Sequence, residues 1–362
     1  MQQILKGYEN IAKALKEVGA NRYMLVCDAA FPYLPIKDVF RPAVIFDQFT
    51  SNPLYEQVCK GVEIFNQKRC DAIVAVGGGS TIDVAKCIKL YCKMTPTVNY
   101  LQQEYNDSGV PLIAVPTTAG TGSESTRYAV IYYEGKKQSV THASIIPDYA
   151  VLEPMLLNSL PLYQKKCTML DAMCQAIESW WSVNSTEESM RLSAMALQAI
   201  VDNLDAYLSV NCSIESAWGM MQGANLAGQA INITQTTAPH AFSYKVTSLY
   251  GLPHGHAVAI CMTEIWHYML RHPEKCIDSR GIEHLDDVME YIAAAMHCEN
   301  ALDALIHFRA LLMYLGIERP RSNTRSIDLE ILTHSVNPVR LKNNPVELDE
   351  ETIRTIYERI LQ

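Results

Sequence analysis

Two patterns of residue spacing follow one another along this 362-residue chain, and their order constrains its fold most strongly. From Tyr23 to about Pro154, short β-branched or apolar runs alternate with stretches of helical spacing, as in a parallel sheet with crossover helices. Beyond Pro161, alanine, leucine, methionine and glutamate recur at three- and four-residue spacing, which predicts helices only. We therefore expect an α/β N-terminal domain with a parallel, Rossmann-like sheet (1–157) and an all-α C-terminal domain (158–362).

Individual strands and helices can be assigned within this pattern. The expected strands are Tyr23–Cys27, Ala43–Phe46, Ala72–Val76, Leu112–Val115, Ala129–Tyr133 and Ala150–Leu152. The expected crossover helices are Pro53–Phe65 and Thr81–Tyr91. In the second half, one helix should begin near Lys166. The last helix should follow Asp349, which can cap it, with acidic residues in its first turn.

Composition excludes several classes of protein. Apolar residues make up 49% of the chain, which is enough for large cores. The net charge of -9 argues against nucleic acid or an anionic membrane as the main partner, because both require a basic face. The eleven cysteines are odd in number and contain no C-x-x-C pair. This cysteine pattern indicates buried thiols in a reducing cytoplasm. No apolar stretch has the character of a signal peptide or a membrane span, which predicts a soluble protein.

A glycine-rich loop follows one of the buried strands. It consists of Gly77, Gly78, Gly79 and Ser80 and leads into a helix that carries Asp83. Backbone N–H groups and a helix N-terminus meet there, a combination that binds pyrophosphate. The run does not match G-x-G-x-x-G, so a plain strand-to-helix turn remains the alternative. We interpret the loop and Asp83 as candidates for cofactor binding.

A second loop, 116–124, follows another buried strand with many hydroxyls and glycines. Its Thr117, Thr118 and Thr121 are further candidates for cofactor binding. Both loops should open at the carboxyl edge of the sheet, where ligands of open α/β sheets bind. Asp28 ends the first strand and could accept hydrogen bonds from a ribose 2′-hydroxyl, which favours NAD(H) over NADP(H). A solvated turn carboxylate is the alternative.

Candidate metal ligands lie in the second half of the chain. Asp171, Gln175 and Glu178 are four and three residues apart, so they share one face of a helix. Such a polar stripe is often only the solvated side of a helix. His240 and His254, near proline and glycine, add two imidazoles, and a carboxylate with two imidazoles can hold a divalent metal ion.

Together these residues resemble the iron-containing (group III) alcohol dehydrogenase family. The resemblance rests on Gly77–Lys86 (GGGSTIDVAK), Pro116–Glu124 (PTTAGTGSE), the D-A-x-x-x-A-I-E helix, the two histidines and Arg340–Pro345. It implies an NAD(P)-dependent alcohol dehydrogenase or aldehyde reductase of dehydroquinate synthase-like fold, with a catalytic metal in the cleft between two domains. Members commonly form homodimers or larger homo-oligomers.

Two positions depart from the family pattern. The family usually holds its metal with an Asp, a His four residues later and two further His. Asp171, His240 and His254 match three of these places, whereas Gln175 stands at the place of the first His. Its amide could ligate the ion or hydrogen-bond a metal-bound water. Tyr244 stands where many members carry another histidine. With His254 it is our candidate catalytic residue, as a proton relay, although it could equally be a packing residue.

Subfamily features resemble a branch associated with phosphonate metabolism, whose members reduce phosphonoacetaldehyde to 2-hydroxyethylphosphonate. They are Cys174–Glu178, Lys137–His142 and Pro239–Tyr244. A phosphonate needs fixed cations, for which Arg127, Lys137, His142 and Lys245 are candidates, and an ordinary surface charge or a cofactor contact is the alternative for each. Lys137 is also a candidate for cofactor binding.

The metal and the reaction stay open at this point. Fe²⁺ is favoured by the resemblance, but Zn²⁺ and Mn²⁺ accept the same ligands. A glycerol dehydrogenase-like polyol oxidation is one alternative, and a non-catalytic nucleotide-binding protein with a degraded metal site is another. A lyase resembling dehydroquinate synthase is disfavoured, because its metal set contains a Glu and its pocket is richly basic.

Overall fold

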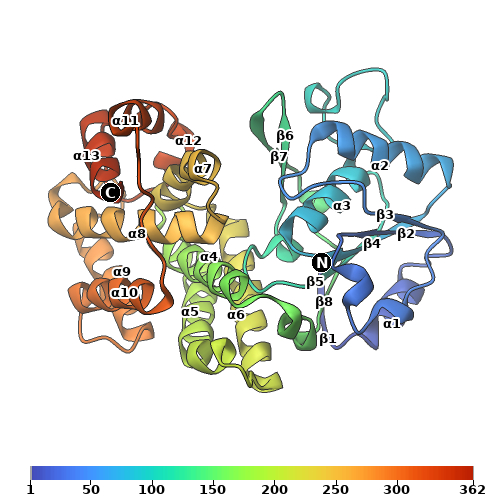
Figure 1. Cartoon of the computed structure of the whole chain (residues 1–362), viewed down its shortest axis with the longest axis horizontal. Helices are drawn as coiled ribbons and strands as arrows, with labels where there is room; N and C mark the ends of the chain where they lie inside the picture. The colour runs from blue at the N-terminus through green and yellow to red at the C-terminus, as the bar shows by residue number, and fades with distance from the viewer. Residues whose placement is uncertain (1, 362) are drawn as a thin grey trace. The chain divides into compact units, whose positions relative to one another are not determined.

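The computed structural model describes residues 2–361 and divides the chain into two compact units (Figure 1). One unit comprises the residues up to Leu160 together with Ser213–Met221. The other comprises Pro161–Cys212 and the residues from Gln222 onward. The division after Leu160 lies close to the expected boundary at 157, but the grouping of Ser213–Met221 with the first unit differs from the expected domains. Its helical spacing gives no sign of that grouping.

The first unit is built on a six-stranded, all-parallel sheet of order β1-β8-β5-β4-β2-β3. Its strands are β1 (Gln3–Lys6), β2 (Tyr23–Cys27), β3 (Val44–Phe46), β4 (Ala72–Gly77), β5 (Leu112–Pro116) and β8 (Tyr149–Leu152). Its helices are α1 (Asn10–Glu17), α2 (Tyr55–Gln67) and α3 (Gly79–Tyr91). Gly77 at the end of β4 pairs with Pro116 at the end of β5, so the two loops predicted to bind a cofactor start side by side.

One strand was assigned to the wrong sheet. The expected strand Ala129–Tyr133 forms β6 (Tyr128–Tyr133), which pairs antiparallel with β7 (Lys136–Thr141) in a separate two-stranded sheet. Glu134 and Gly135 have φ angles of 50° and 70°, as in the two-residue turn of a tight hairpin. β1 and β7 were not predicted, because each contains only one or two apolar residues between polar ones and only Val140 among them is buried.

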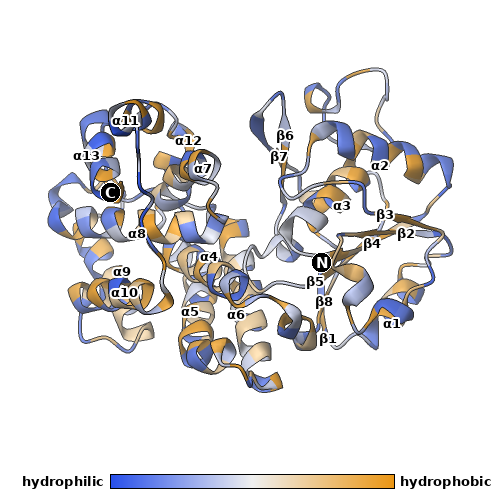
Figure 2. Cartoon of the chain, viewed as in Figure 1, coloured by the Kyte–Doolittle hydropathy of each residue, from blue (hydrophilic) through white to orange (hydrophobic). Residues whose placement is uncertain are grey.

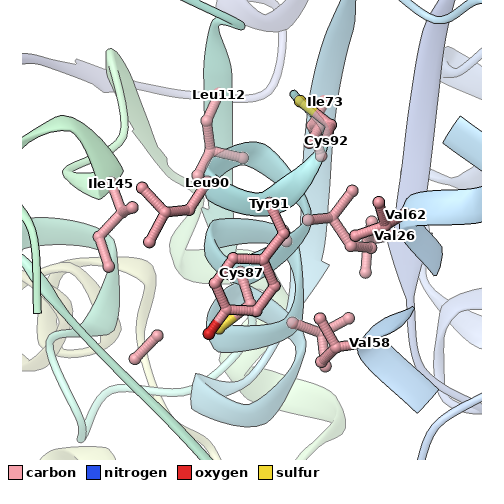
Figure 3. Packing of buried hydrophobic residues seen from close by; sticks show 14 of the residues in the cluster. Val26, Val58, Val62, Ile73, Cys87, Leu90, Tyr91, Cys92, Leu112 and Ile145 are labelled. Atoms are coloured by element: carbon pink, nitrogen blue, oxygen red, sulfur yellow. The ribbon is translucent and has the colours of Figure 1, made fainter. Parts of the chain in front are cut away.

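Both faces of the parallel sheet are covered by apolar side chains. Ile73 and Ala75 of β4 belong to the core beneath α2 and α3, whereas Val74 and Val76 belong to the core on the face covered by α1. Figure 3 shows part of the first core, with Tyr91 of α3 among its apolar neighbours. Figure 2 shows β2 and β4 mostly in hydrophobic colours. Burial on both faces explains why these strands read as continuous apolar runs.

The named elements of the second half are helices. They are α4 (Leu162–Trp181), α5 (Glu187–Leu208), α6 (Ile214–Thr234), α7 (Ala238–Tyr250), α8 (His254–Arg271), α9 (Ile282–Ala295), α10 (Ala301–Leu315), α11 (Arg325–Thr333), α12 (Pro338–Leu341) and α13 (Glu350–Ile360). α4 packs against α5 and α8, and α7 packs against α8. Asp349 caps α13 by accepting a hydrogen bond from the Thr352 N–H (2.8 Å), which confirms the predicted start of that helix.

Two further expectations concern the described chain as a whole. Each of the eleven cysteines is a free thiol. Among residues 2–361, no helix combines the length and apolar character needed to cross a bilayer.

Candidate metal centre and cofactor-binding loops

Three of the predicted metal ligands meet in the helical unit. Asp171 of α4, His240 of α7 and His254 at the start of α8 each offer a ligand atom within 4.8 Å of the others. Asp171 Oδ1 lies 3.3 Å from His240 Nε2 and 4.0 Å from His254 Nε2. Asp171 and His240 are buried, whereas the His254 side chain is 36% exposed. The cluster is therefore closed beneath the first two residues and accessible on the side of His254.

A second carboxylate binds His240 on the side of the ring away from Asp171. Glu178 of α4 is fully buried, and its Oε2 accepts a hydrogen bond from His240 Nδ1. Its Oε1 accepts from the Thr237 N–H (2.9 Å), the Thr237 hydroxyl (3.1 Å) and the His240 N–H (3.2 Å). Because Nδ1 of His240 faces Glu178, Nε2 is the nitrogen directed toward Asp171.

The charges around His240 suit a cation. Burial alone lowers the pKa of an imidazole, but Glu178 and Asp171 outweigh it and raise the pKa of His240 to about 10. An imidazole between two buried carboxylates thus lies in a strongly negative environment. One carboxylate oxygen and two imidazole nitrogens form a donor set that Fe²⁺, Zn²⁺ and Mn²⁺ all accept. The residues present therefore fit a divalent metal ion.

Close helix packing brings His254 to Asp171. A β-carbon added to Gly255 would lie 1.9 Å from the Cys167 carbonyl oxygen and 2.9 Å from Asp171 Cβ. Only a residue without a side chain lets the first turn of α8 approach the backbone of α4 this closely. Gly255 is therefore part of the reason that His254 and Asp171 share one cluster.

The structure distinguishes the other polar residues near the cluster. Gln175 lies one turn after Asp171 on α4 and is buried, so the stripe of Asp171, Gln175 and Glu178 is not the solvated face of the helix. Tyr244 of α7 is half-buried, and its ring stacks beside that of His254 with centroids 6.1 Å apart. His256 does not join the cluster, because its nitrogens lie 2.8 Å from the Tyr163 hydroxyl and 2.7 Å from the Glu318 carbonyl oxygen.

The glycine-rich loop has the geometry expected of a strand-to-helix anion site. Gly78 is the N-cap of α3, and Gly78, Gly79 and Ser80 are only half-buried, whereas Gly77 is buried in β4. A β-carbon on Gly79 would lie 2.8 Å from the Thr121 side chain. The second loop therefore packs directly on the first, and Thr118 and Thr121 remain partly accessible beside it, whereas Thr117 is buried.

Two charged residues of α3 form hydrogen bonds with the second loop and with the residues that follow it. Lys86 is fully buried and donates to the Ser123 hydroxyl (3.1 Å) and to the carbonyl oxygens of Thr126 (2.7 Å) and Tyr128 (2.8 Å). Asp83 accepts from the Ser123 hydroxyl (2.6 Å) and the Val130 N–H (2.9 Å). Burial lowers the pKa of Lys86 to about 8, against the opposing effect of Asp83. Both oxygens of Asp83 are thus engaged within the protein, and a cofactor would compete for them.

Asp28 lies at the same edge of the sheet as the two loops. It is half-buried at the end of β2, and it accepts hydrogen bonds from the Thr81 hydroxyl (3.3 Å) and the Ala30 N–H (2.9 Å). Thr81 is in the first turn of α3, so the carboxylate of Asp28 lies next to the glycine-rich loop.

The candidate cations for an anionic substrate are distributed over both units. Arg127 precedes β6 and His142 follows β7, and the His142 N–H donates to the Arg127 carbonyl oxygen (3.1 Å). Lys137 is half-buried on β7 opposite Tyr132. Lys245 belongs to α7 in the helical unit.

Two supporting residues were not recognised in the sequence. Glu178 was placed on the correct helix face, but its role beneath His240 was not predicted. Asn343 donates to the Thr236 carbonyl oxygen (3.1 Å) just before α7, and its own carbonyl oxygen accepts from the Val183 N–H (3.1 Å). The Arg340–Pro345 segment was the available signal, since it is part of the resemblance to the family and contains Asn343.

Two family profiles match most of the chain. The family profile described as iron-containing alcohol dehydrogenase matches residues 4–154. The profile described as Fe-containing alcohol dehydrogenase family, C-terminal, matches residues 166–361.

Individual relatives cover most of the chain. Phosphonoacetaldehyde reductase of Streptomyces viridochromogenes is 32% identical over 309 residues, covering 80% of this chain and 76% of that protein. NAD-dependent methanol dehydrogenase of Bacillus methanolicus is 30% identical over 269 residues, covering 71% of each. The crystal structure of sulfoacetaldehyde reductase from Bifidobacterium kashiwanohense in complex with NAD⁺ matches with a TM-score of 0.85 and 25% identity, covering 99% of this chain and 96% of that one.

Proposed function

Because the chain belongs to the iron-containing alcohol dehydrogenase family, we propose that it is an NADH-linked reductase of a short aldehyde that carries a phosphonate group. Phosphonoacetaldehyde, reduced to 2-hydroxyethylphosphonate, is the proposed substrate. The observation that carries the proposal is the cluster of Asp171, His240 and His254. We also propose a cytoplasmic enzyme that forms a homodimer or larger homo-oligomer.

The helical unit supplies the groups for carbonyl chemistry. We assign the metal to Asp171, His240 and His254, with Fe²⁺ favoured, and Gln175 as a further ligand or as a hydrogen-bond partner of its water. When bound, a divalent cation supplies a Lewis acid that polarises the aldehyde oxygen. Tyr244 holds a phenol beside the ring of His254, and we assign it delivery of the proton that completes the alcohol.

The first unit supplies the groups for the dinucleotide. We assign the pyrophosphate to the N-terminus of α3 at Gly78, Gly79 and Ser80, since backbone N–H groups and the helix dipole favour an anion there. Thr118 and Thr121 flank this site. Asp28 is assigned to the adenosine ribose, where a carboxylate accepts hydrogen bonds from two hydroxyls and repels a 2′-phosphate. NADH is therefore expected to be preferred over NADPH.

The proposed substrate rests on relatives and on positive charge. A phosphonoacetaldehyde reductase and a sulfoacetaldehyde reductase are both similar to this chain, and their substrates share an aldehyde two carbons from an anionic group. Arg127 and His142 adjoin each other at the base of the β6–β7 hairpin, and Lys137 lies on β7. These side chains are the proposed contacts of the phosphonate.

The test follows NADH and NADPH oxidation by protein loaded separately with Fe²⁺, Zn²⁺ or Mn²⁺. We expect kcat/KM for phosphonoacetaldehyde to exceed that for acetaldehyde by about 100-fold or more, since a fixed charge pair contributes about 2–3 kcal/mol. Equal values for the two aldehydes would contradict the anionic substrate. Activity only as glycerol oxidation would favour the polyol dehydrogenase, and metal binding without turnover of any alcohol or aldehyde would favour a non-catalytic protein.

A further inference from the structure

We infer that Glu178 is a positioning residue that directs Nε2 of His240 toward Asp171 and His254, by binding the imidazole and the first turn of α7 with one carboxylate. The inference rests on the proposed metal site but concerns a residue outside its ligand set. It starts from the hydrogen bonds that Glu178 accepts, all of which lie inside the helical unit.

The first step concerns the start of α7. Its N-cap residue, Thr237, does not cap the helix with its own side chain. The Thr237 hydroxyl instead donates to Glu178 Oε1 and accepts from Trp181 Nε1 (2.9 Å), so two residues of α4 hold it. Glu178 Oε1 also takes the N–H groups of Thr237 and His240, which α7 itself cannot satisfy. A carboxylate from another helix thus replaces the local cap, at the positive end of the α7 dipole.

The second step concerns the imidazole. A carboxylate can only accept hydrogen bonds, so Glu178 Oε2 requires a proton on Nδ1 of His240. In a neutral imidazole this leaves the lone pair on Nε2, the nitrogen 3.3 Å from Asp171 Oδ1. The proton on Nδ1 and the direction of the ring are therefore both set by Glu178. Groups that orient a metal-binding histidine in this way raise metal affinity without touching the ion.

The third step is that one substitution separates the two roles of Glu178, which are to hold the start of α7 and to orient the imidazole of His240. In Glu178→Gln, the amide oxygen can still accept from Thr237 and the His240 N–H, which keeps the start of α7 in place. The amide NH₂ then faces Nδ1 of His240 and donates to it, which moves the ring proton to Nε2 and blocks the nitrogen needed for metal binding. The reverse orientation of the amide would set its NH₂ against two backbone N–H groups.

The experiment measures Zn²⁺ and Co²⁺ affinity of the full chain by competition with a chromophoric chelator, and the melting temperature of the metal-free protein. We expect Glu178→Gln to lower metal affinity about 10–100-fold while keeping the melting temperature of the metal-free protein close to wild type. Glu178→Ala should lower both. Nitrogen-15 NMR of the histidine rings should show the single ring proton of His240 on Nδ1 in the Zn²⁺-loaded wild type, and on Nε2 in Glu178→Gln.

Thr237→Val is the matched control. It removes one hydroxyl donor to Glu178 and the acceptor of Trp181, so it should lower the melting temperature but leave metal affinity within about twofold of wild type. Wild-type metal affinity in Glu178→Gln, or an unchanged ring proton in that variant, would overturn the inference while leaving the proposed function intact. Absence of metal binding in the wild-type chain would instead remove the proposed function and the inference with it.

Discussion

At the scale of single residues, the candidate site differs from its family at one position of the ligand set. Asp171, His240 and His254 form the cluster, and Gln175 lies buried one turn from Asp171 where the family usually has a histidine. An amide oxygen is a neutral ligand and binds a divalent cation more weakly than an imidazole nitrogen does. A metal ion bound at this cluster would therefore have fewer strong donors than the family pattern provides.

Restoring the family residue tests this interpretation. Gln175→His should keep one metal ion per chain and raise its affinity by about tenfold, because the imidazole adds a stronger donor on the same helix face. Gln175→Leu is the control of similar size without a donor, and it should weaken binding if the amide takes part. Chelator competition measures both. If Gln175→His emptied the site, the amide would have a role other than that of a weak ligand.

At the scale of secondary structure, the candidate site combines the first turns of two helices with the middle of a third. His254 is the first residue of α8, and His240 lies in the first turn of α7. α4 contributes Asp171 and the buried Glu178 to the same side. Gly255 lets the start of α8 rest on the backbone of α4. The positions of the ligands thus depend on how three helices pack.

A substitution at Gly255 tests that dependence. In Gly255→Ala the added methyl would meet the Cys167 carbonyl oxygen, so α8 must shift away from α4. We expect a loss of about 1–3 kcal/mol in the free energy of unfolding, as for overpacked cores, and weaker metal binding. Gly223→Ala on α6 is the matched control, since its β-carbon would meet the buried Ile200 side chain at 2.7 Å and the Ala196 carbonyl oxygen at 3.1 Å, and neither residue belongs to the cluster. Gly223→Ala should lower the free energy of unfolding without weakening metal binding. Equal loss of metal affinity in both variants would argue against a specific role of Gly255.

The same elements show what the sequence could and could not predict. β2, β4 and β5 were predictable because strands buried on both faces are continuous apolar runs with turns at their ends. β1 and β7 were not, because their short sequences contain few apolar residues and they are held extended by pairing with β8 and β6. The helix face of Asp171 followed from its spacing. The role of Glu178 did not, because its bonds to Thr237 and His240 span about sixty residues.

At the scale of the whole molecule, the two units carry separate tasks in the proposed function. The sheet unit carries the two loops and Asp28 for a dinucleotide, and the helical unit carries the metal cluster. Lys86 and Asp83 connect α3 to the second loop within the first unit, as Glu178 connects α4 to α7 within the second. In each unit a buried charged residue fixes the backbone beside a site.

The most direct test of this account is a crystal structure of the protein grown with Fe²⁺ or Zn²⁺, with anomalous diffraction recorded at the absorption edge of the metal. We predict one strong peak per chain, about 2.0–2.2 Å from a carboxylate oxygen of Asp171, Nε2 of His240 and a ring nitrogen of His254. A metal peak elsewhere, with these three side chains making no contact to an ion, would contradict the account.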